Sequence, residues 1–203
     1  MSMWHNTTHD WASTLDREHF SAIRSRPGLY APGGVLHLVL EAIAYPVDEA
    51  LHVGAGNCAV ILHSDGSVSV SDDGRGTDTR RDSDGAPVKK PVMATKDLRF
   101  FDSPGAPTLP DGHPRRGMSV VAALSTWLMH TNNRHNGAWT ERYEHAIPVT
   151  DLVPIAGDGS TGTTVHFMPD RALLGPALLT AAELGRCAWP PPITVGITDL
   201  TAT

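Results

Sequence analysis

The sequence predicts an α+β fold, a two-layer sandwich in which helices pack on a mixed, mostly antiparallel sheet. Three observations predict it. Apolar residues recur at helical spacing from Val35 to Val53, and several short segments have the alternation of half-buried strands. Helices and strands do not alternate along the chain, as they would in a parallel α/β fold.

The composition is that of one globular domain. A chain of 203 residues with 40% hydrophobic residues can bury a substantial core. The formal charge of -6 argues against direct DNA binding. No apolar run approaches the roughly 20 residues of a membrane span, and the first residues lack the apolar core of a signal peptide, so we expect a soluble cytoplasmic protein. Cys58 and Cys187 stand outside any metal-ligand spacing and are expected to be small core residues.

Residues 1–17 are predicted to form an N-terminal arm, with the domain at 18–203. The arm is polar and carries two tryptophans, Trp4 and Trp11. Tryptophans suit a docking role on the body or on a second copy of the chain, which would make a homodimer. A frayed terminus is the alternative interpretation.

Two helices are expected before the first strand. The first is short and covers Glu18 to Arg26, and the second covers Val35 to Val53. Inside the second, Pro46 removes a backbone hydrogen bond and clashes with an earlier carbonyl. A kink or break is therefore expected near Tyr45.

Two strands follow, from Cys58 to His63 and from Ser67 to Ser71, joined by a tight turn. The second strand ends in the run Asp72-Asp73-Gly74-Arg75-Gly76. A carboxylate therefore lies at the end of the strand. The glycines that follow allow the backbone to come close to a group bound by that carboxylate. Taken alone, the run favours a surface hairpin loop.

Periodicity disappears between residues 77 and 116. Six prolines lie in this stretch, interrupted by a candidate short helix from Val92 to Phe101. Forty residues without a clear element predict a functional loop or a mobile lid. Regular structure resumes at Gly117. The remaining expected elements are a helix over Met118 to Leu124, strands over Thr126 to Thr131, Ala138 to His145 and Thr163 to Met168, a helix over Leu173 to Cys187 and a strand over Ile193 to Leu200.

Three motifs in this order resemble the N-terminal ATPase domain in the B subunit of DNA gyrase, a member of the GHKL superfamily. They are Glu41, the run from Asp72 to Gly76, and the segment from Thr161 to Phe167. Supporting matches lie at Ile23 to Tyr30, Asp48 to Ala50, Ser119 to Ser125 and Tyr143 to His145. The resemblance covers nearly the whole chain and implies a Bergerat-type fold in a truncated, stand-alone homologue, because gyrase continues into a transducer domain.

The resemblance implies a pocket for ATP or ADP. Asp72 would accept a hydrogen bond from the adenine amino group, with Thr163 beside it. Glu41 would be the general base that polarises a water. The other implied nucleotide-binding residues are the turn glycines Gly74 and Gly76, the rim arginines Arg75 and Arg134, and the adenine-slot residues Val70, Ile43, Met118 and Val165. An ordinary solvated arginine is the alternative for both Arg75 and Arg134, and the place of Arg134 within a hairpin turn favours it there.

Departures from the family concern the phosphate end of this pocket. Tyr45 replaces the magnesium-holding asparagine, and a phenol is a poor magnesium ligand, which argues against bound Mg²⁺ and leaves Glu41 as a candidate ligand. The glycine-rich phosphate loop reads Gly112 to Gly117, with Arg115 at a glycine position and Pro114 lacking an amide donor. Gly117 and the side chains of Arg115 and Arg116 remain as phosphate contacts. The lid motif Gly-Gly-Lys and the transducer lysine are missing.

The adenine end is thus preserved and the phosphate end eroded. We expect an adenine-nucleotide-binding, regulatory pseudoenzyme with weak or absent ATP hydrolysis. One alternative is a slow ATPase in which arginines replace the phosphate loop and Asp48 or Glu49 helps to hold magnesium. Others are an interaction scaffold with a vestigial pocket and a binder of gyrase-directed antibiotics. Whether Tyr45 and Pro46 block the pocket is left open.

Overall fold

The computed structural model describes residues 15–79, 83–85, 93–101, 105–135, 137–157 and 159–201. Most of the predicted arm, including Trp4 and Trp11, lies outside these residues. Among the described helices, none combines the length and the hydropathy that crossing a bilayer requires.

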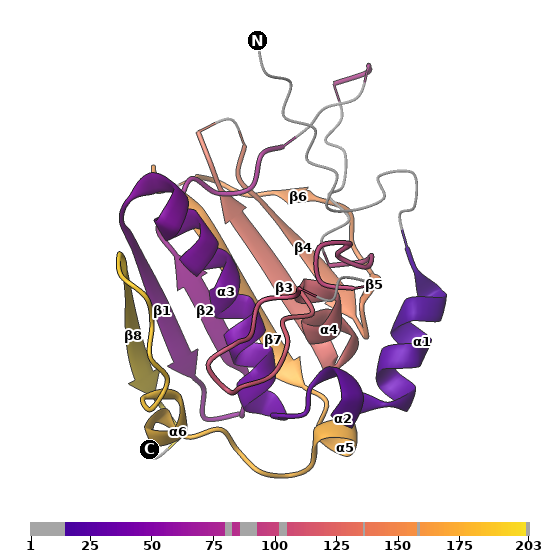
Figure 1. Ribbon diagram of the computed structural model, residues 1–203. Helices are drawn as coiled ribbons and strands as arrows, with labels where there is room; N and C mark the ends of the chain where they lie inside the picture. Colours follow the sequence, from indigo (N-terminus) through magenta and orange to yellow (C-terminus); the bar gives the residue numbers. More distant parts are fainter. Residues whose placement is uncertain are drawn as a thin grey trace.

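Helices cover one face of a single sheet (Figure 1). The strand order is β5-β4-β3-β7-β2-β1-β8, and β6 pairs with β4. Among the described strands, β1 and β8 pair in parallel and the other pairs are antiparallel. The predicted two-layer α+β sandwich with a mostly antiparallel mixed sheet is confirmed.

The strands lie close to their predicted positions, because alternation of apolar and polar residues marks several of them in the sequence. Their bounds are β1 Gly56–Leu62, β2 Val68–Asp72, β3 Ser125–Asn133, β4 Trp139–Glu144, β5 Ile147–Pro148, β6 Val153–Pro154, β7 Gly162–Pro169 and β8 Ile193–Asp199. The two short strands β5 and β6 were not expected.

The helices are α1 Arg17–Ser25, α2 Pro27–Tyr30, α3 Val35–Val53, α4 Met118–Ala123, α5 Arg171–Leu174 and α6 Ala181–Leu184. Two expectations are wrong. The helix expected over 173–187 is two short helices, since Gly175, at φ 89°, ends the first of them and proline follows. Residues 93–101, expected to be helical, form turns.

Helix α3 continues through Pro46, so of the expected kink or break the break does not occur. Its inner face packs on the sheet, where Val39, Ile43 and Pro46 are buried. Proline in a helix interior costs about 3 kcal/mol, and burial of a long apolar face outweighs that loss. The continuous helix packs mainly on β1 and β2.

Strands β2 and β7 pair at the centre of the sheet under α3 (Figure 1). The register sets Val70 opposite Val165 and Ser71 opposite Thr164. The next step along both strands brings Asp72 beside Thr163. Two motifs about 90 residues apart in the chain therefore meet at the same end of the sheet.

Candidate functional site

Asp72 lies at the end of β2 and is held by three donors. Its Oδ1 accepts a hydrogen bond from the Gly74 N–H at 2.8 Å, and its Oδ2 accepts from the Thr163 hydroxyl and, at 3.3 Å, from the Thr163 N–H. Burial is the largest influence on this carboxyl and raises the pKa of Asp72 despite the donors. The predicted pair of Asp72 and Thr163 is thus brought together.

A cavity of about 80 Å³ opens beside this carboxylate. Four predicted pocket residues line it together with Asp72, namely Val70, Met118, Thr163 and Val165. Ile43 is instead fully buried in the hydrophobic core and does not line the cavity. Tyr45, Pro46 and Met93 also form its walls. These side chains keep the cavity well below the roughly 300–1,000 Å³ of typical small-molecule sites.

Gly74 and Gly76 are required for the packing around Asp72. Gly76 has φ 73°, and a Cβ there would collide with the backbone oxygen of Asn133. A Cβ at Gly74 would lie 2.8 Å from Asp72 Oδ1. A side chain at Gly76 would displace the turn that follows β2, and one at Gly74 would push away the Asp72 carboxylate.

The two rim arginines anchor the same turn. Arg75 pairs with Glu49 of α3 through two contacts, 2.5 Å from Nε to Oε1 and 2.9 Å from Nη2 to Oε2. The Arg75 hydrogen bond lowers the pKa of Glu49, although this exposed pair contributes little to stability. Arg134 donates to the Gly76 carbonyl at 2.9 Å, and its side chain remains 32% exposed.

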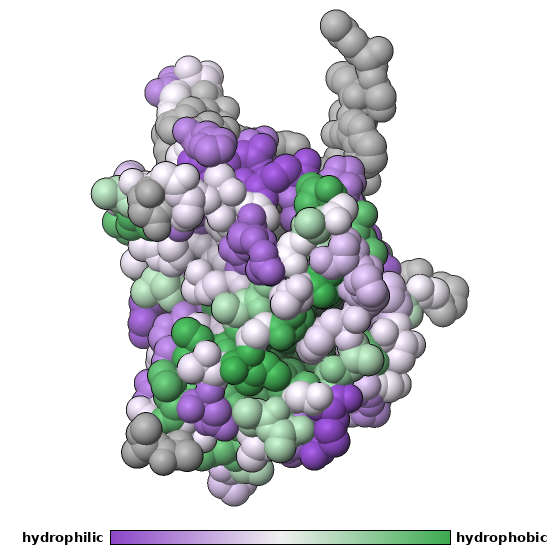
Figure 2. Space-filling view, turned by 90° about the vertical axis from the view of Figure 1, so that its left-hand side faces the viewer, coloured by the Kyte–Doolittle hydropathy of each residue, from purple (hydrophilic) through white to green (hydrophobic). Residues whose placement is uncertain are grey.

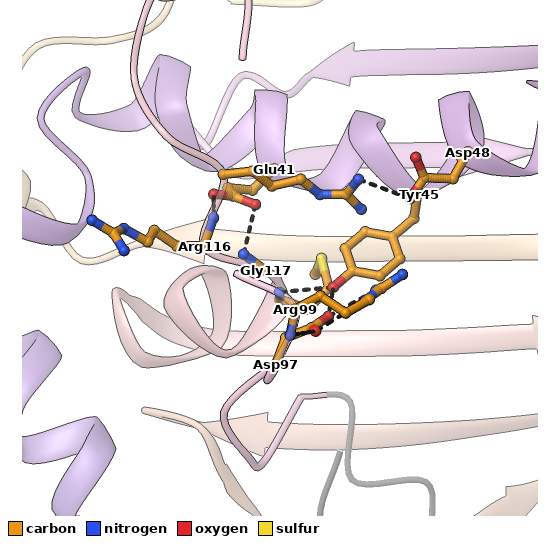
Figure 3. Close-up of polar contacts among 9 residues, drawn as sticks. Glu41, Tyr45, Asp48, Asp97, Arg99, Arg116 and Gly117 are labelled. Carbon is orange, nitrogen blue, oxygen red and sulfur yellow. Dashed lines mark hydrogen bonds and ion pairs between the residues drawn. The ribbon is translucent and has the colours of Figure 1, made fainter. Parts of the chain in front are cut away.

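Glu41, the predicted general base, is fully buried and bonded to backbone (Figure 3). Its Oε1 accepts from the Arg116 N–H and its Oε2 from the Gly117 N–H at 2.8 Å. A general base needs the proton that it removes within hydrogen-bond reach. In this conformation Glu41 instead binds two amides of the predicted phosphate loop.

Tyr45 lies one helical turn beyond Glu41 and occupies the neighbouring amide (Figure 3). Its hydroxyl accepts from the Met118 N–H at 3.4 Å and donates to Asp97 Oδ2 at 3.2 Å. Burial, followed by the charge of Asp97, raises the pKa of Tyr45, which keeps the phenol neutral. A neutral phenol engaged in this way is not a metal ligand. Within the described part of the chain, no group of three His, Cys, Asp or Glu residues could hold a metal.

Arg115 and Arg116 differ in their surroundings. Arg115 is only 4% exposed, and its guanidinium lies 4.6 Å from the Tyr45 ring centroid and 4.4 Å from that of Phe100. Its Nη1 donates to Asp48 Oδ2 at 2.8 Å. The Arg116 side chain reaches the Phe100 carbonyl at 3.4 Å. Both arginines therefore pack against the 93–101 segment, and Arg115 is stacked on Tyr45.

Sequence reasoning missed His37. It lies fully buried on α3, with Nδ1 2.6 Å from Asp111 Oδ2 and Nε2 3.4 Å from Glu41 Oε1. Its spacing of four residues from Glu41, which places both on one helix face, could have revealed it. Burial disfavours the imidazolium, but contacts with Glu41 and Asp111 outweigh it, so the pKa of His37 is raised.

The raised pKa predicts that stability depends on the charge of His37. The stabilisation that comes from the charged His37 is fully present below about pH 6.5, the pKa of histidine in an unfolded chain. It is lost as the pH rises through the higher pKa that His37 has in the folded state. We expect the free energy of unfolding in urea to fall more between about pH 6 and pH 9 in the wild type than in His37→Gln. Equal pH dependence in the two proteins would contradict the charged pair.

Comparisons with known proteins find relatives, although no model of a protein family matches the chain. The chain is similar to the B subunit of DNA topoisomerase 4 from Bacillus subtilis, with 35% identity over 161 residues, 77% of this chain and 25% of the relative. It is 33% identical over 178 residues to the same protein from Staphylococcus epidermidis, covering 85% of this chain and 26% of the relative. It is 36% identical over 167 residues to the B subunit of DNA gyrase from Mycobacterium tuberculosis, covering 80% of this chain and 24% of the relative. The chain spans about a quarter of the length of these relatives.

Proposed function

Because the chain is a homologue of the B subunits of DNA gyrase and topoisomerase IV over about a quarter of their length, we propose that it is a GHKL-type adenine-nucleotide-binding domain. The domain recognises the adenine end of ATP or ADP and hydrolyses ATP weakly or not at all. Its role would then be regulatory, with the bound nucleotide acting as a signal and not as a source of energy through hydrolysis.

The Asp72 site carries this proposal. A carboxylate that is half-buried beside an apolar cavity is suited to accept a hydrogen bond from an amino group in that cavity. Val70 and Val165 supply apolar walls beside it. Binding of a whole purine requires the cavity to widen, and the side chains of Tyr45 and Met93 are the walls that have to move.

The phosphate end supports the second half of the proposal. The amides of Arg116, Gly117 and Met118 are bonded to the protein's own side chains, which are Glu41 for the first two and Tyr45 for the third. A triphosphate would have to displace a buried carboxylate to reach them, and its negative charge would face that carboxylate. We therefore expect phosphates to add little to affinity.

A calorimetric comparison of ligands tests the proposal. We expect adenosine, ADP and ATP to bind within about tenfold of one another, a spread of about 1.4 kcal/mol. Adding Mg²⁺ should change none of the three affinities, because Tyr45 stands where a metal ligand would be needed. Guanosine is the matched control, since its carbonyl cannot donate to Asp72. ATP binding that strengthens about a hundredfold over adenosine with Mg²⁺ would contradict the closed phosphate end.

A slow ATPase is the second candidate, favoured by one observation. His37 and Asp111 lie in line behind Glu41, an arrangement that could orient a general base once Glu41 is released from the loop. Phosphate release above background that is lost in Glu41→Gln would favour this candidate. If no nucleoside or nucleotide binds, an interaction scaffold or a binder of gyrase-directed antibiotics is the remaining interpretation. Homodimerisation through the arm stays a prediction from sequence.

A further inference from the structure

The two edges of the sheet differ in character. At one end the outermost strand is β5, which has two residues, and one of them is Pro148. At the other end the outermost strand is β8, which has seven residues. Within the described residues, no strand pairs with the outer side of β8. Short strands and prolines prevent a sheet edge from pairing with another chain, so the β5 edge is protected in this way and the β8 edge is not.

Strand β8 also lacks the charges and irregularities that protect a long edge. Its pairing with β1 runs in an unbroken register from Ile193 to Asp199, without a bulge. The strand contains no lysine, arginine or proline, and its one charged residue, Asp199, is the last. The outer row of its backbone groups is therefore a template for a further strand.

Gly196, at the centre of β8, is not explained by the structure of a single chain. Glycine weakens the interior of a strand, and where it occurs it marks a positive φ, a bulge or the close approach of another backbone. Gly196 does not have a positive φ, and the register around it is regular. A Cβ at this position would meet no heavy atom within 4 Å among the described residues. A second backbone that lies against the edge is the explanation that remains.

The residues around Gly196 identify this second strand as a copy of β8. The sequence from Thr194 to Thr198 is Thr-Val-Gly-Ile-Thr, which has the same chemical order in both directions. A two-fold axis at Gly196 would pair β8 with its own copy in antiparallel. The exposed threonines of the two copies would then lie opposite one another, and each half-buried valine would lie opposite an isoleucine. Both are favourable cross-strand pairs.

Charge does not oppose this pairing, although the chain has a formal charge of -6. The five residues around the two-fold axis are uncharged. The Asp199 side chains of the two copies would lie six residues apart along the paired strands, about 20 Å. That distance is well beyond the Debye length of about 8 Å at physiological ionic strength. The two copies therefore meet without like charges facing each other.

The surface beside β8 supplies the area that a stable dimer needs. Such interfaces bury about 1,200–2,000 Å² in total, more than one pair of short strands provides. Figure 2 shows the side of the molecule on which α3 and β8 lie, where apolar surface gathers around a hollow. This hollow, of about 660 Å³, lies between α3, residues 107–110 and residues 186–190, and the last of these segments leads into β8. Leu51, in its wall, is 56% exposed.

We propose that β8 is a homodimer interface, at which two copies of this chain pair β8 with β8 in antiparallel about a two-fold axis at Gly196. The sheet is then continuous through both copies, and the two helix layers lie side by side on one face of it. The interface involves neither the Asp72 cavity nor residues 1–17, so it does not depend on nucleotide binding or on the arm.

Sedimentation velocity of the full chain over a range of concentrations tests this interface. We expect the wild type to sediment as a dimer, with twice the 21.7 kDa mass of one chain. Gly196→Lys and Gly196→Glu should each weaken dimerisation at least about a hundredfold, because like charges meet at the two-fold axis. An equimolar mixture of these two variants should recover the dimer, since opposite charges then face each other. Circular dichroism checks that each variant retains the fold.

Two further variants locate the interface. Ala59→Lys adds the same charge on β1, where Ala59 is exposed and stands opposite Gly196 in the register. The two added charges would lie three strand spacings apart, about 14 Å, so the dimer should persist. Trp4→Ala combined with Trp11→Ala should also leave the dimer intact, which separates this interface from dimerisation through the arm. A monomeric wild type, loss of the dimer in either of these variants, or a mixture of the Gly196 variants that stays monomeric would each overturn the proposal.

Discussion

Exchanging Asp72 for asparagine is expected to lower adenosine affinity at least about a hundredfold, a loss of about 3 kcal/mol. The carboxylate is an acceptor only, whereas an asparagine amide can turn its NH₂ toward the adenine amino group and set donor against donor. The Thr163 hydroxyl would favour that orientation, because it now donates to Asp72 and would continue to donate to the amide oxygen. Isothermal calorimetry with adenosine measures the loss.

Asp73→Asn is the matched control. Asp73 is the neighbouring acid, but it is exposed. Its carboxylate accepts hydrogen bonds from the backbone N–H of Asn57 at 2.7 Å and from the side-chain amide of Asn57 at 2.6 Å. Adenosine affinity should be unchanged in this variant. Thermal unfolding of both variants checks that the fold is retained. Wild-type adenosine affinity in Asp72→Asn would remove the basis of the proposed function.

Removal of the Glu41 side chain is expected to cost about 2–4 kcal/mol of unfolding free energy, a large part of the stability of a domain of this size. Glu41→Ala leaves the amides of Arg116 and Gly117 without an acceptor in the interior and leaves the buried His37 without one of its two carboxylate partners. Unfolding in urea, followed by circular dichroism, measures the change. A catalytic carboxylate that faces water would show almost no loss of stability.

Glu41→Gln and an exposed glutamate complete this test. Glutamine keeps one carbonyl oxygen that can accept from a loop amide. The loss of unfolding free energy in Glu41→Gln should therefore lie between zero and the loss in Glu41→Ala. Glu144→Ala is the control, since Glu144 is exposed on β4 and its ion pair with Arg142, at 3.4 Å, is on the surface. We expect it to change stability by less than about 0.5 kcal/mol. Equal effects of Glu41→Ala and Glu144→Ala would contradict the internal role of Glu41.

Much of the fold was predictable because it follows from local patterns. The alternation of Val68 and Val70 with serines marks β2, and the helical spacing from Val35 to Val53 matches α3 at both ends. The failures are where local pattern and context conflict. Pro46 argued for a kink or break, but the helix continues through it, and the segment over 173–187 looked helical but is interrupted by glycine and proline.

The sequence by itself determined the architecture and the meeting of Asp72 with Thr163, because hydrophobic periodicity sets strand faces and the family order sets their neighbours. Only the tertiary structure decided what happens at the phosphate end. Glu41 lies 75 residues from Arg116 in the chain, and residues 77–116, which lead to Arg116, have no periodicity from which their path could be inferred. That path places the loop amides on the buried Glu41 carboxylate and Arg115 beside Tyr45. The same path leaves a cavity of about 660 Å³ between α3, residues 107–110 and residues 186–190, since cavities depend on how distant segments pack and not on the pattern of any one of them.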